Sequence, residues 1–108
     1  MTHNIPIPIW LRLWFQGALI GEVYPEIRAI AVGLSKEKEL TVRYYLDREP
    51  NEFDYDSVQS VVSAVLSNTS SDHQIASARE ECIYSRDKQS TIERLGGGLV
   101  YARREYDG

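Results

Sequence analysis

The chain has 108 residues, of which 43% are hydrophobic and 26% are charged, and its net charge is −4. This size and composition indicate one folded domain over residues 1–108 and argue against extended disorder. Nucleic-acid binding needs a basic surface, so an acidic chain of this kind is not expected to bind nucleic acid directly.

The N-terminal apolar run and the cysteine content predict where the protein works. The run from Ile5 to Ile20 has no Lys or Arg before it, holds Arg12 in its middle and is shorter than the ~20 residues of a membrane span. We therefore expect no signal peptide and no membrane contact. A single cysteine, Cys82, excludes an internal disulfide and is typical of a reducing compartment. Together these features predict a cytoplasmic protein.

The first predicted helix covers residues 9–19, IWLRLWFQGAL. Its only polar side chains, Arg12 and Gln16, are four residues apart and share one narrow stripe. A helix that is apolar around most of its girth is buried on several sides or lies at an oligomer interface. Core packing is the expectation for its aromatic residues, with a homodimer or hetero-oligomer interface as the alternative. The residues assigned to that alternative are Trp10, Leu13 and Trp14.

Two strands are predicted next, over residues 26–32 and 40–46, joined by the charged turn 36–39. Apolar and polar residues alternate through LTVRYYL (40–46), which is the pattern of a half-buried strand. The pair is predicted to form an antiparallel hairpin. Tyr44 and Tyr45 point to opposite faces, so one of them is expected to be partly exposed.

The spacing of the apolar residues then changes to that of a helix over residues 54–68. Five apolar residues recur there at helical spacing, and they are Val58, Val61, Val62, Val65 and Leu66. Asp54 is predicted to be the N-cap residue, with Phe53 and Val58 as a hydrophobic staple.

Two further strands are predicted over residues 73–85 and 99–106, separated by a polar loop at 86–98 in which the glycines Gly96–Gly98 give a flexible approach to the last strand. The predicted order is α-β-β-α-β-β. Strands that come in linked pairs favour an α+β fold with an antiparallel sheet and helices packed on one face.

The segment 46–56, LDREPNEFDYD, contains five carboxylates and one arginine, and so carries a net charge of −4, equal to that of the whole chain. It does not fit a calcium loop that starts at Asp47, because Glu52 stands where glycine is needed and Val58 where a bidentate glutamate is needed. A catalytic pair of acids would need one member in an apolar setting, and a Pro- and Asn-containing link is not one. A metal site built from scattered carboxylates is a minor alternative.

Other catalytic candidates are few. His3 and His73 lack ligand-like spacing, Cys82 has no cysteine partner, and the glycine run precedes a strand rather than a helix. No cofactor, no metal and no catalytic set are therefore predicted. A small enzyme using His73 and a carboxylate is kept as a minor alternative.

A local field of one sign steers a partner of the opposite sign, and an exposed tyrosine within a charged rim is typical of a binding hot spot. A solvated loop is the simplest alternative. The candidate partner-binding residues are Asp47, Glu49, Glu52, Asp54, Tyr55 and Asp56.

The chain resembles small bacterial immunity proteins of contact-dependent growth inhibition and related polymorphic toxin systems. The resemblance lies in three spans, LIGEVYPEIRAIAV (19–32), LTVRYYLDREPNEFDYDSVQSVVSAV (40–65) and LVYARRE (99–105). It rests on the order of elements and on the strand, acidic link and helix pattern, and it includes no catalytic signature. The charged stretch 86–95 is longer than in the proteins it resembles.

The resemblance implies a non-enzymatic protein that binds the C-terminal domain of a cognate toxin and blocks it. Many such toxins are nucleases with basic clefts, which an acidic surface could occupy. From the residues alone, the alternative is a small non-catalytic subunit or scaffold that acts through its apolar first helix.

Overall fold

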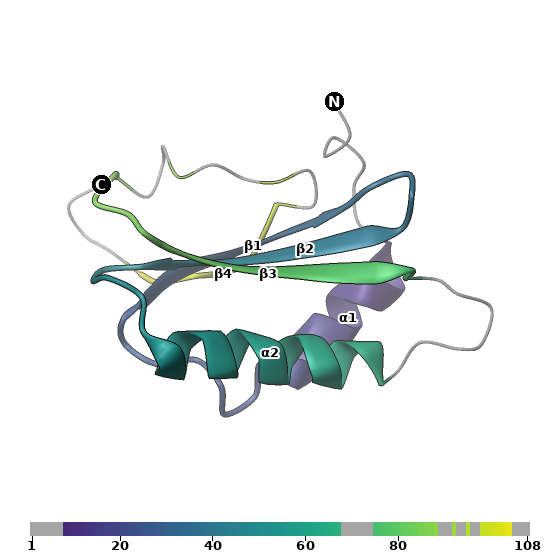
Figure 1. Ribbon diagram of the computed structural model, residues 1–108, viewed down its shortest axis with the longest axis horizontal. Helices are drawn as coiled ribbons and strands as arrows, with labels where there is room; N and C mark the ends of the chain where they lie inside the picture. The colour runs from purple at the N-terminus through teal and green to yellow at the C-terminus, as the bar shows by residue number, and fades with distance from the viewer. Residues whose placement is uncertain (1–7, 68–74, 89–91, 93–94, 96–97, 105–108) are drawn as a thin grey trace.

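The computed structural model describes residues 8–67, 75–88, 92, 95 and 98–104. Two helices and four strands follow one another in the predicted order, and both helices lie on one face of the sheet (Figure 1). The elements are α1 (Ile9–Ala18), β1 (Ile27–Leu34), β2 (Glu39–Leu46), α2 (Glu52–Leu66), β3 (Ser77–Tyr84) and β4 (Leu99–Ala102). The α+β class and the one-sided helix layer are confirmed.

The sheet has the strand order β3-β2-β1-β4. The hairpin β1–β2 is antiparallel, as predicted, with Val32 opposite Val42 and Leu34 opposite Leu40. β4 adds to the free edge of β1, also antiparallel.

The pairing of β3 differs from the prediction of a wholly antiparallel sheet. β3 runs parallel to β2, with Glu39 opposite Ser77 and Leu46 opposite Tyr84. The physical reason is α2, which follows β2 in the chain and runs back along one face of the sheet. The chain thus returns to the end of the sheet where β2 began, and β3 starts there in the same direction as β2. The sheet is therefore mixed.

The main core lies between the sheet and the helices. Valines 58, 61 and 65 of α2 are fully buried, which confirms the helical period predicted for this segment. Tyr44 of β2 is also fully buried, and its hydroxyl lies 3.0 Å from Ser57 Oγ, which satisfies a polar group that would otherwise be costly to bury.

A second, smaller core covers the opposite face of the sheet. Ala29, Ala31 and Tyr45 lie there beneath Ile92 and Leu95, two apolar residues of the stretch predicted to be a polar loop. Tyr45 is only 5% exposed, so the expectation that either Tyr44 or Tyr45 would be partly exposed was wrong. The two helices cover one face of the β1–β2 hairpin, and Ile92 and Leu95 lie on the other.

α1 buries Leu11 and Phe15 and leaves Leu13 57% exposed. Trp10 and Trp14 are half-buried against the main core, with their ring centroids 4.7 Å apart. Their packing agrees with the core expectation, and the exposure of Leu13 keeps the interface alternative open. Among the described residues, no helix is long and apolar enough to cross a membrane.

Candidate functional site

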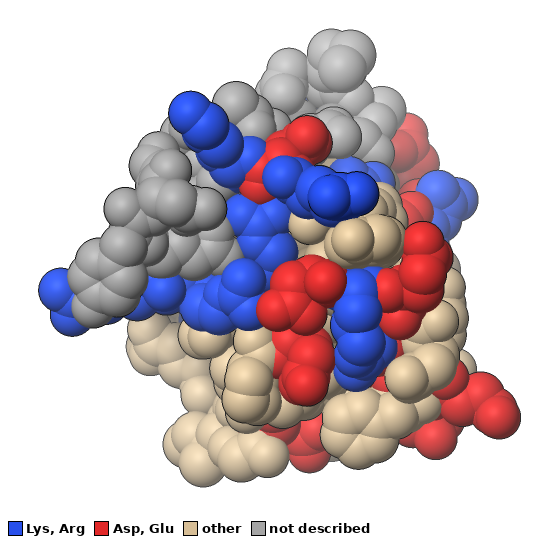
Figure 2. Space-filling model, turned by 90° about the vertical axis from the view of Figure 1, so that its left-hand side faces the viewer, with Lys and Arg blue, Asp and Glu red and all other residues tan. Residues whose placement is uncertain are grey.

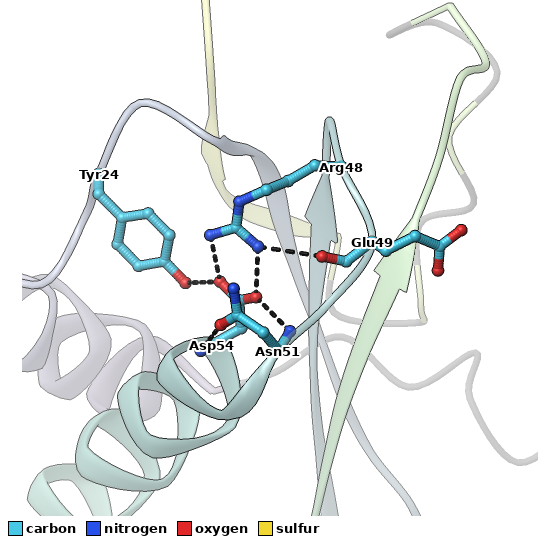
Figure 3. A network of polar contacts seen from close by, with 5 residues as sticks. All are labelled: Tyr24, Arg48, Glu49, Asn51 and Asp54. Atoms are coloured by element: carbon cyan, nitrogen blue, oxygen red, sulfur yellow. Dashed lines mark hydrogen bonds and ion pairs between the residues drawn. The ribbon is translucent and has the colours of Figure 1, made fainter.

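Asp54, one of the acids assigned to a partner, lies at the centre of an internal polar network (Figure 3). Its carboxylate is fully buried and accepts two hydrogen bonds from Arg48, at 2.6 and 3.0 Å. The hydroxyl of Tyr24 donates to the same carboxylate at 2.6 Å, and the backbone N–H of Asn51 donates at 2.8 Å. Asp54 therefore has a structural role in the described structure, and we leave it out of the partner surface proposed below.

The same contacts fix the charge state of Asp54. Burial by itself would raise the pKa of its carboxyl, but the hydrogen bonds from Arg48, Tyr24 and the Asn51 backbone outweigh burial and hold that pKa below its ordinary range. Burial and the bond to Asp54 raise the pKa of Tyr24 above its ordinary value, so the phenol stays a donor. The network is a charged pair held by neutral donors.

The start of α2 also differs from the prediction. The N-cap residue is Asn51, whose side chain accepts from the backbone N–H of Asp54 at 3.4 Å, and Asp54 takes the third position of a reciprocal capping box. Because the cap is Asn51, Phe53 lies within the first turn of α2 and not in the position before the cap that the predicted staple with Val58 requires. Phe53 is 60% exposed and packs edge-on against Tyr24, with ring centroids 5.0 Å apart.

Asp47 belongs to a different environment from the rest of the segment. Its carboxylate accepts a hydrogen bond from Arg103 at 2.7 Å, and Arg103 also donates to the carbonyl of Pro25 at 2.8 Å. Asp47 lines a cavity of about 330 Å³ that Arg28, Arg86, Lys88 and Arg103 line as well. Asp47 therefore lies among basic side chains, which distinguishes it from the other acids of the segment.

Four acids of the segment are exposed, and one of them, Asp47, is paired with Arg103. We call the other three, Glu49, Glu52 and Asp56, the acidic surface. Glu52 and Asp56 are one helical turn apart on α2, and Glu49 precedes the helix in the link from β2. Figure 2 shows this end of the molecule, with acidic side chains in the middle, on the right and at lower right, one basic side chain between those in the middle, and further basic side chains on the left and along the top. Tyr55, the predicted anchor, is 42% exposed.

A groove next to the acidic surface was not predicted from the sequence. It has a volume of about 350 Å³ and lies between α2 and the segment 21–24 that leads from α1 to β1. Tyr24 and Phe53 give it aromatic walls, and Glu22 and Asp56 give it carboxylates. Only the helical spacing of Phe53 and Asp56 could have indicated that these two residues share a face.

The remaining candidates do not assemble a site within the described residues. No group of three or more His, Cys, Asp and Glu side chains there could hold a metal ion. Cys82 is buried, and burial raises the pKa of its thiol to about 12. His3 and His73 lie outside the described residues.

A small α+β domain with acidic and aromatic side chains exposed at one end has the features of a protein-binding domain. A family model described as MafI2 immunity protein matches residues 8–105. Because this match covers most of the chain, the chain belongs to the MafI2 immunity protein family, and the resemblance to small bacterial immunity proteins is confirmed. The family implies a cognate toxin as the partner. A comparison with curated proteins gives no match.

Proposed function

We propose that this protein neutralises its cognate toxin by binding the toxin domain through the acidic surface, Glu49, Glu52 and Asp56, with Tyr55 beside it. The toxin domain is proposed to be a nuclease with a basic substrate cleft, and the protein to act without catalysis in the cytoplasm, where nucleic acid is the substrate to be protected. The observation that carries the proposal is that these three carboxylates are exposed, whereas Asp54 is buried against Arg48 and the exposed Asp47 is paired with Arg103.

Electrostatics supports this choice of surface. Carboxylates fixed near a rigid helix start resemble the phosphates that a basic cleft binds, and charges of opposite sign raise the rate of encounter. The Arg48–Asp54 pair anchors the link to α2, and these two segments carry the residues of the acidic surface. A link anchored in this way loses less entropy when a partner binds.

The test is a titration of toxin activity. The purified toxin domain is incubated with nucleic acid and increasing amounts of the protein, and cleavage is measured. Complete inhibition at one protein per toxin domain is expected if the cleft is blocked. Cleavage that persists when all toxin is in the complex would contradict occlusion of the cleft, and the absence of a complex would contradict the assignment of this toxin.

A second candidate function uses α1. Leu13 and Ile9 are 57% and 76% exposed, so this helix offers an apolar surface next to the half-buried Trp10 and Trp14. In this alternative the protein is a non-catalytic subunit or scaffold that forms a homo- or hetero-oligomer. Light scattering separates the two candidates, because a mass of 12.4 kDa at every concentration is expected for a monomeric immunity protein. A mass twice as large that falls to the monomer in an L13D variant would favour the oligomer.

A further inference from the structure

The groove between α2 and the segment 21–24 has both aromatic rings and carboxylates in its walls, and a planar, positively charged side chain complements both. We propose that it receives an arginine of the toxin domain, with the guanidinium on the ring of Phe53 and between the carboxylates of Glu22 and Asp56. This inference rests on the proposed function, since it names the group that the partner inserts beside the acidic surface.

The local structure explains why the groove exists. Gly21 has a φ of +79°, a left-handed conformation that glycine adopts at little cost, and the chain turns there after α1 to run beside α2. On α2, Phe53, Asp56, Ser57 and Ser60 recur at helical spacing and form the opposite wall. The two walls are thus set by backbone elements rather than by flexible side chains alone.

The aromatic wall offers a flat face for a cation. Phe53 is 60% exposed although it packs edge-on against Tyr24. The hydroxyl of Tyr24 is bound to the buried carboxylate of Asp54, which restrains that ring. A guanidinium stacks on an aromatic ring more favourably than an ammonium does, because it is planar and less strongly hydrated.

The carboxylates of the groove favour a positively charged side chain as its occupant. Glu22 lies on one wall, where its Oε1 accepts from Ser57 Oγ at 3.5 Å, and Asp56 lies on the other. An apolar side chain filling the groove would remove water from both carboxylates without replacing it, which is unfavourable. An arginine side chain supplies five N–H donors to these oxygens and an apolar stem to Val23.

The first experiment uses small probes and needs no toxin. N-acetyl-arginine amide, N-acetyl-lysine amide and the neutral N-acetyl-citrulline amide are titrated into the labelled protein, and amide chemical shifts are followed. We expect shifts at residues 22–24 and 53–57, with arginine binding about three- to tenfold more tightly than citrulline and more tightly than lysine. The variants E22Q and F53L should lose this preference. Equal shifts from all three probes, or none at these residues, would overturn the inference.

The second experiment measures affinity for the toxin domain. F53L keeps apolar volume but removes the aromatic face, and we expect it to weaken binding about tenfold, as at a hot spot. Y84L is the matched control, because it makes the same aromatic-to-leucine change at an exposed position on β3 and should leave affinity unchanged. Thermal melts verify that each variant is folded. If folded F53L binds as tightly as the native chain, the toxin does not use the groove. If the native chain binds no toxin yet prefers arginine amide, the proposed function fails while the groove remains an arginine site.

Discussion

Arg48 and Asp54 form a two-point ion pair, with nitrogen–oxygen distances of 2.6 and 3.0 Å, that joins the link after β2 to the first turn of α2. Asp54 is fully buried, whereas the side chain of Arg48 is 33% exposed. One of the five acids in the segment is therefore used to position the others. The pair ties together the two backbone segments that carry Glu49, Glu52 and Asp56.

Removing the arginine should destabilise the fold. In R48M the buried Asp54 carboxylate keeps Tyr24 and the Asn51 backbone as donors but loses its cation, and we expect the free energy of unfolding to fall by about 2–4 kcal/mol. Urea denaturation measures it. R86M makes the same side-chain change at an exposed position and should cost less than about 0.5 kcal/mol. Similar losses for the two variants would contradict the structural role of the pair.

Asp54 also predicts a pH dependence. Its pKa is lower in the folded protein than the ordinary value of about 3.9, so ionised Asp54 stabilises the fold above that value. That contribution is lost as the pH falls through the folded pKa. We expect the difference in unfolding free energy between pH 7 and pH 3 to be smaller in D54N than in the native protein. An equal difference would show that Asp54 is not the group responsible.

The second core makes a prediction about a stretch that looks polar in the sequence. Ile92 and Leu95 are each 4% exposed and pack on Tyr45, Ala29 and Ala31. Truncating a buried side chain of this size removes apolar burial and leaves a cavity, so I92A and L95A should each lower the free energy of unfolding by about 2–4 kcal/mol. K36A, at an exposed position in the hairpin turn, is the control. Neutral effects for both would mean that this face of the sheet is not covered by them.

Cys82 should be unreactive in the folded protein. It is buried on β3, and burial raises the pKa of its thiol to about 12, so the nucleophilic thiolate is scarce at pH 8. A thiol reagent added at pH 8 should label the native protein at least about tenfold more slowly than the urea-unfolded protein. Equal labelling rates would place the thiol at the surface.

Much of the fold could be predicted because its signals are local. The alternation in 40–46 and the valine spacing in α2 each indicate burial of one face, and both predicted ranges end within a few residues of the observed elements. The direction of β3 could not be read in this way, since it depends on how α2 crosses the sheet. The burial of Ile92 and Leu95 could not be predicted either, because two apolar residues in a charged stretch show no helical or strand spacing.

The candidate site was harder to predict because its residues are grouped by tertiary contacts. From the sequence, the five acids are predicted to form one surface. In the structure, Tyr24 binds Asp54 and Arg103 binds Asp47, although both partners are distant in the sequence. Phe53 is predicted from the sequence to make a helix-start contact, and in the structure it lies beside Tyr24 at a groove. Composition therefore located the charged end of the molecule but not the roles of the individual acids.

Docking at the acidic surface is tested by the association rate of the toxin domain with two charge variants, measured at several salt concentrations. E49Q/E52Q removes two charges from the acidic surface, and E37Q/D87N removes two from exposed positions elsewhere, so that the net charge of the variants is equal. If the acidic surface steers the toxin, E49Q/E52Q should slow association by about three- to tenfold at low salt and reduce its salt dependence, while E37Q/D87N stays close to the native rate. Identical rates and salt slopes for the two variants would contradict docking at this surface.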